Sequence, residues 1–113
     1  NHGWHSPQFL DAMAKRYPRA TFIQGHYPGS TWAGAVNDNE NVWFSTTNYF
    51  PWGSVEEMVR LCRNDRIVWG SDLSDLQYGW GLGPILCAEI PEETRVRILS
   101  SNGRELFQRI LSR

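Results

Sequence analysis

The chain has 113 residues, 41% of them hydrophobic and 20% charged, which is the composition of one folded domain. Eleven basic and twelve acidic residues give a formal net charge of -1, so we expect neither nucleic acid nor a membrane surface as a partner. No stretch approaches the roughly 18 consecutive apolar residues of a membrane span, and no secretory signal opens the sequence. We expect a cytoplasmic protein. The first residue is Asn1, not methionine, which indicates processing or a missing N-terminal portion.

A first helix is predicted from Pro7 onward. Ser6 can cap its free backbone amides, and proline fits the first helical position. Pro18 ends the helix. The apolar face between them has helical spacing and comprises Phe9, Leu10, Met13, Ala14 and Tyr17. A short strand is predicted next, at about residues 20–25, and it leads into His26.

The middle of the chain predicts a loop, a strand and a helix. Residues 27–40 are rich in Gly, Pro, Asn and Asp, with room for a short helix at 31–36. Residues 41–46 combine β-branched and aromatic types, which favour a strand, and a polar cluster at 45–48 follows. Residues 54–57 match a capping box led by serine, and the helix after it has apolar residues at Val55, Met58, Val59 and Cys62.

The last third begins with a strand at about 66–70, whose uninterrupted apolar run predicts burial on both faces. A long glycine-punctuated loop is expected at 71–83, with a short helix near 84–88. A helix at about 91–99 starts at a proline followed by two glutamates, and Asn102-Gly103 is a stop signal. The final helix, at about 103–112, has a predicted apolar seam of Leu106, Phe107, Ile110 and Leu111.

This alternation of helices and strands is typical of parallel β-α units. A closed barrel of eight such units needs roughly 200 residues or more, so we expect a single partial α/β domain. Cys62 and Cys87 lie outside any C-x-x-C spacing and on apolar helical patterns. They predict two buried free thiols in a reducing compartment.

Groups able to do chemistry follow each predicted strand: His26 after the first, the polar cluster at 45–48 after the second, and Asp72 after the third. Parallel strands would bring these ends to one edge, where α/β barrels build active sites. Histidine and aspartate on separate strands suit metal-assisted hydrolysis, because a metal lowers the pKa of a bound water and aspartate can accept its proton. Taken singly, either residue could instead be structural.

The chain resembles the C-terminal part of the amidohydrolase-related family. That family belongs to the metal-dependent amidohydrolase superfamily and includes hydrolases and nonoxidative decarboxylases of the aminocarboxymuconate-semialdehyde type. The segments that carry the resemblance are, in order, His2-Gly3, 16–18 with 21–26, 41–46, 66–72, and 98–102 with Leu106-Phe107.

The resemblance implies the last three strands of a (β/α)8 barrel and a divalent metal, zinc or alternatively manganese. Asp72 would be a metal ligand and proton acceptor, His26 would act on the substrate, and His2, or else His5, would be a second metal ligand. Residues expected to contact a small carboxylate or carbonyl substrate are Tyr27, Thr46, Asn48 and Trp52. The His-x-His pair that opens these barrels is absent from the sequence.

Three functions therefore stay open. The first is part of a metal-dependent hydrolase or decarboxylase. The second is a non-catalytic partial barrel, whose strand edges would pair with the missing N-terminal half or with a second copy of the chain. The third is an α/β module that binds a small ligand, in which His26 and Asp72 are structural.

Overall fold

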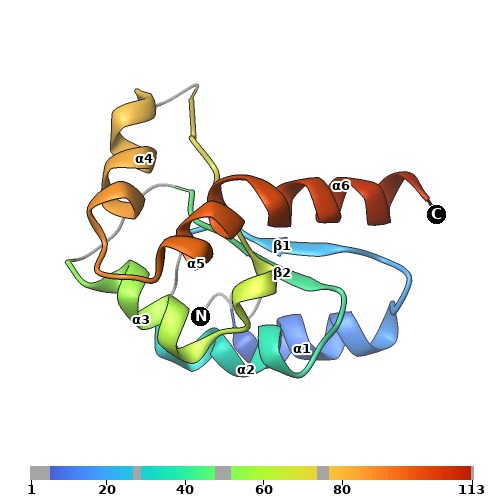
Figure 1. The fold of residues 1–113 in the computed structure, drawn as a ribbon. Helices are drawn as coiled ribbons and strands as arrows, with labels where there is room; N and C mark the ends of the chain where they lie inside the picture. The colour runs from blue at the N-terminus through green and yellow to red at the C-terminus, as the bar shows by residue number, and fades with distance from the viewer. Residues whose placement is uncertain (1–5, 27–28, 48–51, 74–76, 113) are drawn as a thin grey trace.

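A computed structural model describes residues 6–26, 29–47, 52–73 and 77–112. Within these residues the chain forms a parallel three-stranded sheet in the order β1-β2-β3, with helices around it (Figure 1). The strands are β1 (Phe22–Gln24), β2 (Val42–Ser45) and β3 (Ile67–Val68). The predicted α/β class with three parallel strands is confirmed, although each strand is shorter than predicted. Four candidate site residues, His2, His5, Tyr27 and Asn48, lie outside the described residues.

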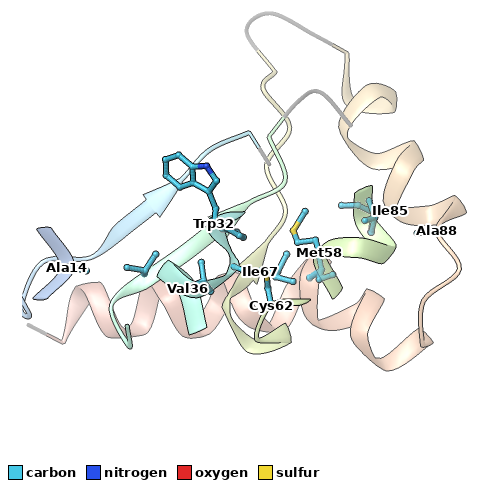
Figure 2. Packing of buried hydrophobic residues seen from close by; sticks show 13 residues of the cluster. Ala14, Trp32, Val36, Met58, Cys62, Ile67, Ile85 and Ala88 are labelled. Atoms are coloured by element: carbon cyan, nitrogen blue, oxygen red, sulfur yellow. The ribbon is translucent and has the colours of Figure 1, made fainter. Parts of the chain in front are cut away.

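One face of the sheet carries the main hydrophobic core. Because side chains alternate along a strand, Val42 and Phe44 share this face with Ile67, which pairs with Phe44. Three helices supply the other side of the core: α1 (Pro7–Arg16), α2 (Ala33–Asn37) and α3 (Ser54–Leu61). Figure 2 shows Ala14, Val36 and Met58 from these helices gathered around the sheet. The structure thus packs the crossover helices as parallel β-α units require.

The opposite face is covered by the C-terminal helix α6 (Asn102–Leu111), which runs along the far side of the sheet from α1 and α2 (Figure 1). Leu106 of α6 forms a second buried cluster with Trp43 and Val68, and the Arg109 guanidinium lies 5.9 Å from the centre of the Trp43 ring. In a closed barrel helices form only an outer ring. Here α6 covers the face of the sheet that would point into a closed barrel, and it buries the Trp43 ring.

Two helix starts compare the local sequence signals with the structure. The Ser6 cap of α1 is confirmed, because its Oγ accepts a hydrogen bond from the Phe9 amide at 3.1 Å. The capping box at 54–57 is not formed as predicted. Gly53 is the N-cap of α3, with φ of 81°, and its carbonyl accepts from the Glu57 amide, so Ser54 lies inside the helix. The left-handed turn at glycine moves the helix start one residue upstream.

The predicted loop at 71–83 is partly wrong, because residues 78–83 belong to helix α4 (Tyr78–Cys87). Three glycines and an internal Pro84 argue locally against a helix. Gly81, however, packs on the end of β3: a Cβ there would lie 3.1 Å from the Gly70 carbonyl oxygen. The absence of a side chain therefore lets the helix lie against the β3 backbone, and this tertiary contact outweighs the local preference. Cys87, at the end of α4, is exposed, so only Cys62 is the buried thiol that we expected.

The stop signal at Asn102-Gly103 is also wrong. Helix α5 (Glu92–Val96) continues through a π-helical segment, η3 (Arg97–Ser101), directly into α6. Within this π segment the Ile98 carbonyl accepts a hydrogen bond from the Trp69 amide at 3.0 Å. Asn102 is buried, and its amide donates to the carbonyls of Asn64 and Ile67 at 2.6 and 2.7 Å. Asn102 thus fastens the long helix to the start of β3 instead of ending it.

The predicted seam of the last helix is only partly buried. Leu106 is 5% exposed, whereas Phe107, Ile110 and Leu111 are exposed by 66, 43 and 83%. The helical spacing was correct, but the three-stranded sheet covers only the stripe around Leu106. Among the described residues, no helix is long and apolar enough to cross a membrane.

Ion pairs join the start of β3 to neighbouring segments. Arg66 is 1% exposed and lies between Glu40, at 2.6 Å, and Asp65, at 2.8 Å, with its guanidinium 4.8 Å from the centre of the Trp43 ring. Arg63 pairs with the same two carboxylates. Arg66 therefore packs at the start of β3, which we call the foot of the sheet, and also neutralises charge there.

Acid should weaken this cluster. Hydrogen bonds from Arg63 and Arg66 hold the pKa of Glu40 below its usual 4.5. Burial raises the pKa of Asp65, but Arg63 and the charge of Arg66 outweigh it and hold this pKa below 3.8. The unfolded chain binds these protons more readily than the folded protein does. At a pH above their usual pKa values both carboxylates therefore stabilise the fold. This stabilisation is lost as the pH falls through their lower pKa values in the folded protein.

We therefore expect the free energy of unfolding to be level near neutrality and to fall below about pH 4.5. Urea unfolding measured between pH 3 and 7 checks this expectation. The double variant Glu40→Gln, Asp65→Asn should show a shallower acid slope than the wild type. An unchanged slope would show that the cluster does not carry the acid sensitivity. The effect is modest because the Glu40 side chain is 72% exposed.

Candidate functional site

The carboxyl ends of the three strands are packed closely through small residues. A Cβ placed on Gly70 would lie 2.5 Å from the Ser45 Oγ and 2.8 Å from the Thr47 Cγ2, and one on Gly25 would lie 3.2 Å from the Thr47 Oγ1. Thr47 in turn donates to the Ser45 Oγ at 3.0 Å. Thr47 is thus held between the ends of β1 and β3. This packing confirms that the three strand ends meet at one edge of the sheet.

Thr46, which we expected to contact substrate, has a structural contact here. It is fully buried, its amide donates to the Val68 carbonyl at 2.8 Å, and its Oγ1 accepts from the Gly70 amide at 3.3 Å. Its side chain continues the β2–β3 pairing one step beyond the strands. Of the three hydroxyl residues at the end of β2, Ser45 and Thr47 are partly exposed and Thr46 is buried.

His26 and Asp72 share an unusual backbone conformation. Their φ angles are 56° and 51°, and they are the two non-glycine residues with positive φ in the described part of the chain. This left-handed region is uncommon outside glycine, though His and Asp enter it more readily than most residues. Strained backbone of this kind clusters at functional sites. Here the two residues follow the two outer strands at the same edge.

The sheet geometry sets the scale of the site. β1 and β3 both pair with β2, and neighbouring strands lie about 4.8 Å apart, so the two outer strands are separated by about 10 Å. His26 comes two residues after β1 and Asp72 four residues after β3. Side chains from these positions can approach a common small ligand above the end of β2.

Helix α4 forms a wall beside Asp72. Gly81 rests on the backbone of Gly70 and Ser71, and the Tyr78 ring stacks on Trp69 with centroids 6.1 Å apart and planes 24° from parallel. The Trp69 indole nitrogen is buried and has no hydrogen-bond partner among the described residues. The candidate site therefore has an aromatic boundary on its β3 side.

The donor set fits a metal only in part. Zinc sites in proteins use nitrogen, sulfur and oxygen ligands, and catalytic ones usually take three from the protein. His26 and Asp72 offer an imidazole and a carboxylate of these types. Within residues 6–26, 29–47, 52–73 and 77–112, however, no group of three His, Cys, Asp or Glu residues could hold a metal ion. A complete site thus needs at least one further ligand, and His2 and His5 lie outside the described residues.

A comparison with sequence models of protein families shows to which family the chain belongs. The sequence model of the family described as Amidohydrolase matches residues 3–109, nearly the whole chain. The chain belongs to the amidohydrolase family. Searches of curated proteins and of solved structures returned no match. The match spans all three strands and includes His26 and Asp72.

Membership in the amidohydrolase family agrees with the fold. Proteins of this superfamily generally bind divalent metals, and their barrels place chemistry at the carboxyl ends of the strands. That edge is where His26, Asp72 and the hydroxyls of Ser45 and Thr47 gather in this amidohydrolase chain. Thr47 belongs to the polar cluster at 45–48 that the sequence singled out, but its packing role was not foreseen. Its position between two glycines, Gly25 and Gly70, is a property of strand pairing.

Trp52 was expected at the substrate site because it stands beside Gly53 at a turn. The structure places it just before α3 with its side chain fully exposed, lining a cavity between α3 and α4. Neither His26 nor Asp72 lines this cavity. The described residues thus do not bring Trp52 together with the other two candidates.

Proposed function

We propose that this chain contributes to the active site of a metal-dependent amidohydrolase that hydrolyses or decarboxylates a small carboxylate or carbonyl compound. The observation that carries the proposal is the pairing of His26 and Asp72 at one edge of the sheet, both with positive φ, in a chain of this family. Backbone strain at two donor residues that follow separate strands is more simply explained by a shared task than by two unrelated turns.

In this proposal Asp72 is a metal ligand that also accepts a proton during the reaction, and His26 hydrogen-bonds or protonates the substrate. His2, or alternatively His5, supplies a further ligand. A divalent metal, zinc or else manganese, would polarise the substrate and lower the pKa of a bound water. The close packing through Gly25 and Gly70 holds the two strand ends at a fixed spacing, which such a site requires.

Removing the Asp72 carboxylate should abolish both metal binding and activity. The test compares metal content, and turnover of carboxylated aromatic and lactone substrates after zinc or manganese addition, for the wild type and Asp72→Asn. We expect a loss of activity of at least about 100-fold, because changing a residue that merely supports a metal ligand already reduces activity by about 10- to 100-fold. Asp65→Asn, at the other end of β3, is the matched control and should retain activity. Unchanged metal content in Asp72→Asn would refute the assignment.

A non-catalytic partial barrel is the second candidate function. It is favoured by the donor count, since the described residues contain fewer than three possible ligands around one point. In that case the chain acts through the outer edge of β1, which has no strand partner within the described sheet, whereas the outer edge of β3 already bonds to Ile98 and Asn102. Ile23 of β1 pairs with Trp43 and is 50% exposed, so this face of β1 is also partly uncovered.

We propose as partner either a complementary barrel portion or a second copy of the chain. Size-exclusion chromatography with light scattering measures this directly. An association state above the 13.0 kDa monomer supports strand-edge pairing. A monomer that unfolds cooperatively would oppose it.

A further inference from the structure

A cavity of about 630 Å³ lies between the start of α3 and the second half of α4. Its volume is within the range of small-molecule sites, roughly 300–1,000 Å³. The apolar part of the lining includes Val55, Pro84 and Ala88, and Trp52 lies at its rim. Sites of this kind combine apolar walls with a few polar groups that orient the ligand.

The charged groups of the lining are two carboxylates, those of Glu56 and Glu89. The Glu56 Oε1 accepts a hydrogen bond from the Glu89 amide at 2.8 Å, which fixes this carboxylate in the cavity wall. In the part of the chain that the structure describes, no arginine or lysine forms an ion pair with either carboxylate. Both carboxylates thus lie beside an apolar surface without an ion-pair partner among the described residues.

A second cavity of about 430 Å³ adjoins the first at the Glu56–Glu89 contact. It shares these two residues and adds Glu57 and Arg60. Acidic side chains thus outnumber basic ones in the lining of the two cavities. This excess favours a positively charged ligand.

Trp52 adds a second feature that favours a cation. Its side chain is completely exposed, so no protein group among those described covers the indole. The face of an indole ring is the strongest cation-π acceptor among side chains. An aromatic rim beside carboxylates is the combination that binds organic ammonium groups.

We propose that the α3–α4 cavity binds a small organic cation. Its ammonium group would lie against Glu56 and Glu89, and its apolar body against Val55, Pro84 and Ala88. Trp52 would cover the bound cation from the rim. This inference goes beyond the proposed amidohydrolase activity, because neither His26 nor Asp72 lines the cavity.

The test uses three probes of similar shape: benzylammonium, neutral benzyl alcohol and anionic benzoate. Binding is followed by NMR titration at two salt concentrations. We expect benzylammonium to bind about tenfold more tightly than benzyl alcohol, a difference of about 1.4 kcal/mol, and to weaken at high salt. Benzoate should not bind. Equal affinities for the charged and neutral probes would overturn the proposal.

Two variants locate the cation. Glu56→Gln keeps an oxygen that can accept from the Glu89 amide but removes the charge, so it should lower benzylammonium affinity about tenfold without changing Tm. Glu93→Gln is the matched control, since this glutamate of α5 lines neither cavity, and it should bind like the wild type. Equal losses in both variants would contradict the assignment. Asp72→Asn should bind the probe normally, which separates this test from that of the metal site.

Discussion

Replacing Arg66 with alanine is expected to destabilise the protein by about 3–4 kcal/mol. The change removes a side chain that is 1% exposed and leaves a void beside Trp43, as in other large-to-small core substitutions. It also leaves Glu40 and Asp65 without one of their two arginine partners. The larger share comes from packing, because both carboxylates keep contact with water and with Arg63. Urea unfolding gives the value.

Two companion variants separate charge from volume. Arg66→Met retains most of the volume against Trp43 and should cost about half as much as Arg66→Ala. Arg63→Ala removes a guanidinium that pairs with the same carboxylates but is 34% exposed, so a loss of less than about 1 kcal/mol is expected. Equal losses for Arg63→Ala and Arg66→Ala would show that the ion pairs, and not burial, determine the effect.

Gly70→Ala is the second change with a large expected effect. The new Cβ would lie 2.5 Å from the Ser45 Oγ and 2.8 Å from the Thr47 Cγ2, so these side chains, or the strand ends that carry them, must shift at the candidate site. We expect a loss of about 1–3 kcal/mol, as for other overpacked positions. Thermal unfolding measures this loss. Metal content should fall in parallel, because the spacing of the strand ends changes.

The chain provides its own control for this prediction. Gly103 lies in α6, and apart from its own helix backbone no atom of the described residues lies within 4 Å of the position that a Cβ would take there. Gly103→Ala should therefore stabilise the helix by about 0.5–1 kcal/mol. Removing the facing hydroxyl in the double variant Gly70→Ala, Ser45→Ala should recover part of the lost stability. No recovery would show that Thr47 and the backbone, rather than Ser45, limit the space.

Local patterns were sufficient for elements whose own residues determine them. The β-branched and aromatic run of β2 and the Ser6 cap of α1 both predicted the structure correctly. Local patterns failed where a contact with residues distant in the sequence determines the structure. The α4 helix exists despite its glycines because Gly81 packs against Gly70, and Asn102 bridges two carbonyls 35 and 38 residues away.

The candidate site was predictable to the same extent. Strand order placed His26 and Asp72 at one edge, since parallel strands must align their ends. Their left-handed backbone could not be foreseen, because both residue types adopt it only in certain tertiary settings. The burial of Thr46 was likewise hidden, as it depends on a hydrogen bond to the Gly70 amide across the sheet.

At the carboxyl edge of this sheet we expect Asp72 to bind the metal, with His26 placed beside it to act on the substrate. Zinc titration followed by backbone and imidazole NMR signals tests this expectation most directly. We expect shifts concentrated at 25–26 and 70–72, with none at Glu40 or Asp65 at the foot of the sheet, and we expect these shifts to be lost in Asp72→Asn. Shifts confined to Glu56 and Glu89, or unchanged in Asp72→Asn, would contradict it.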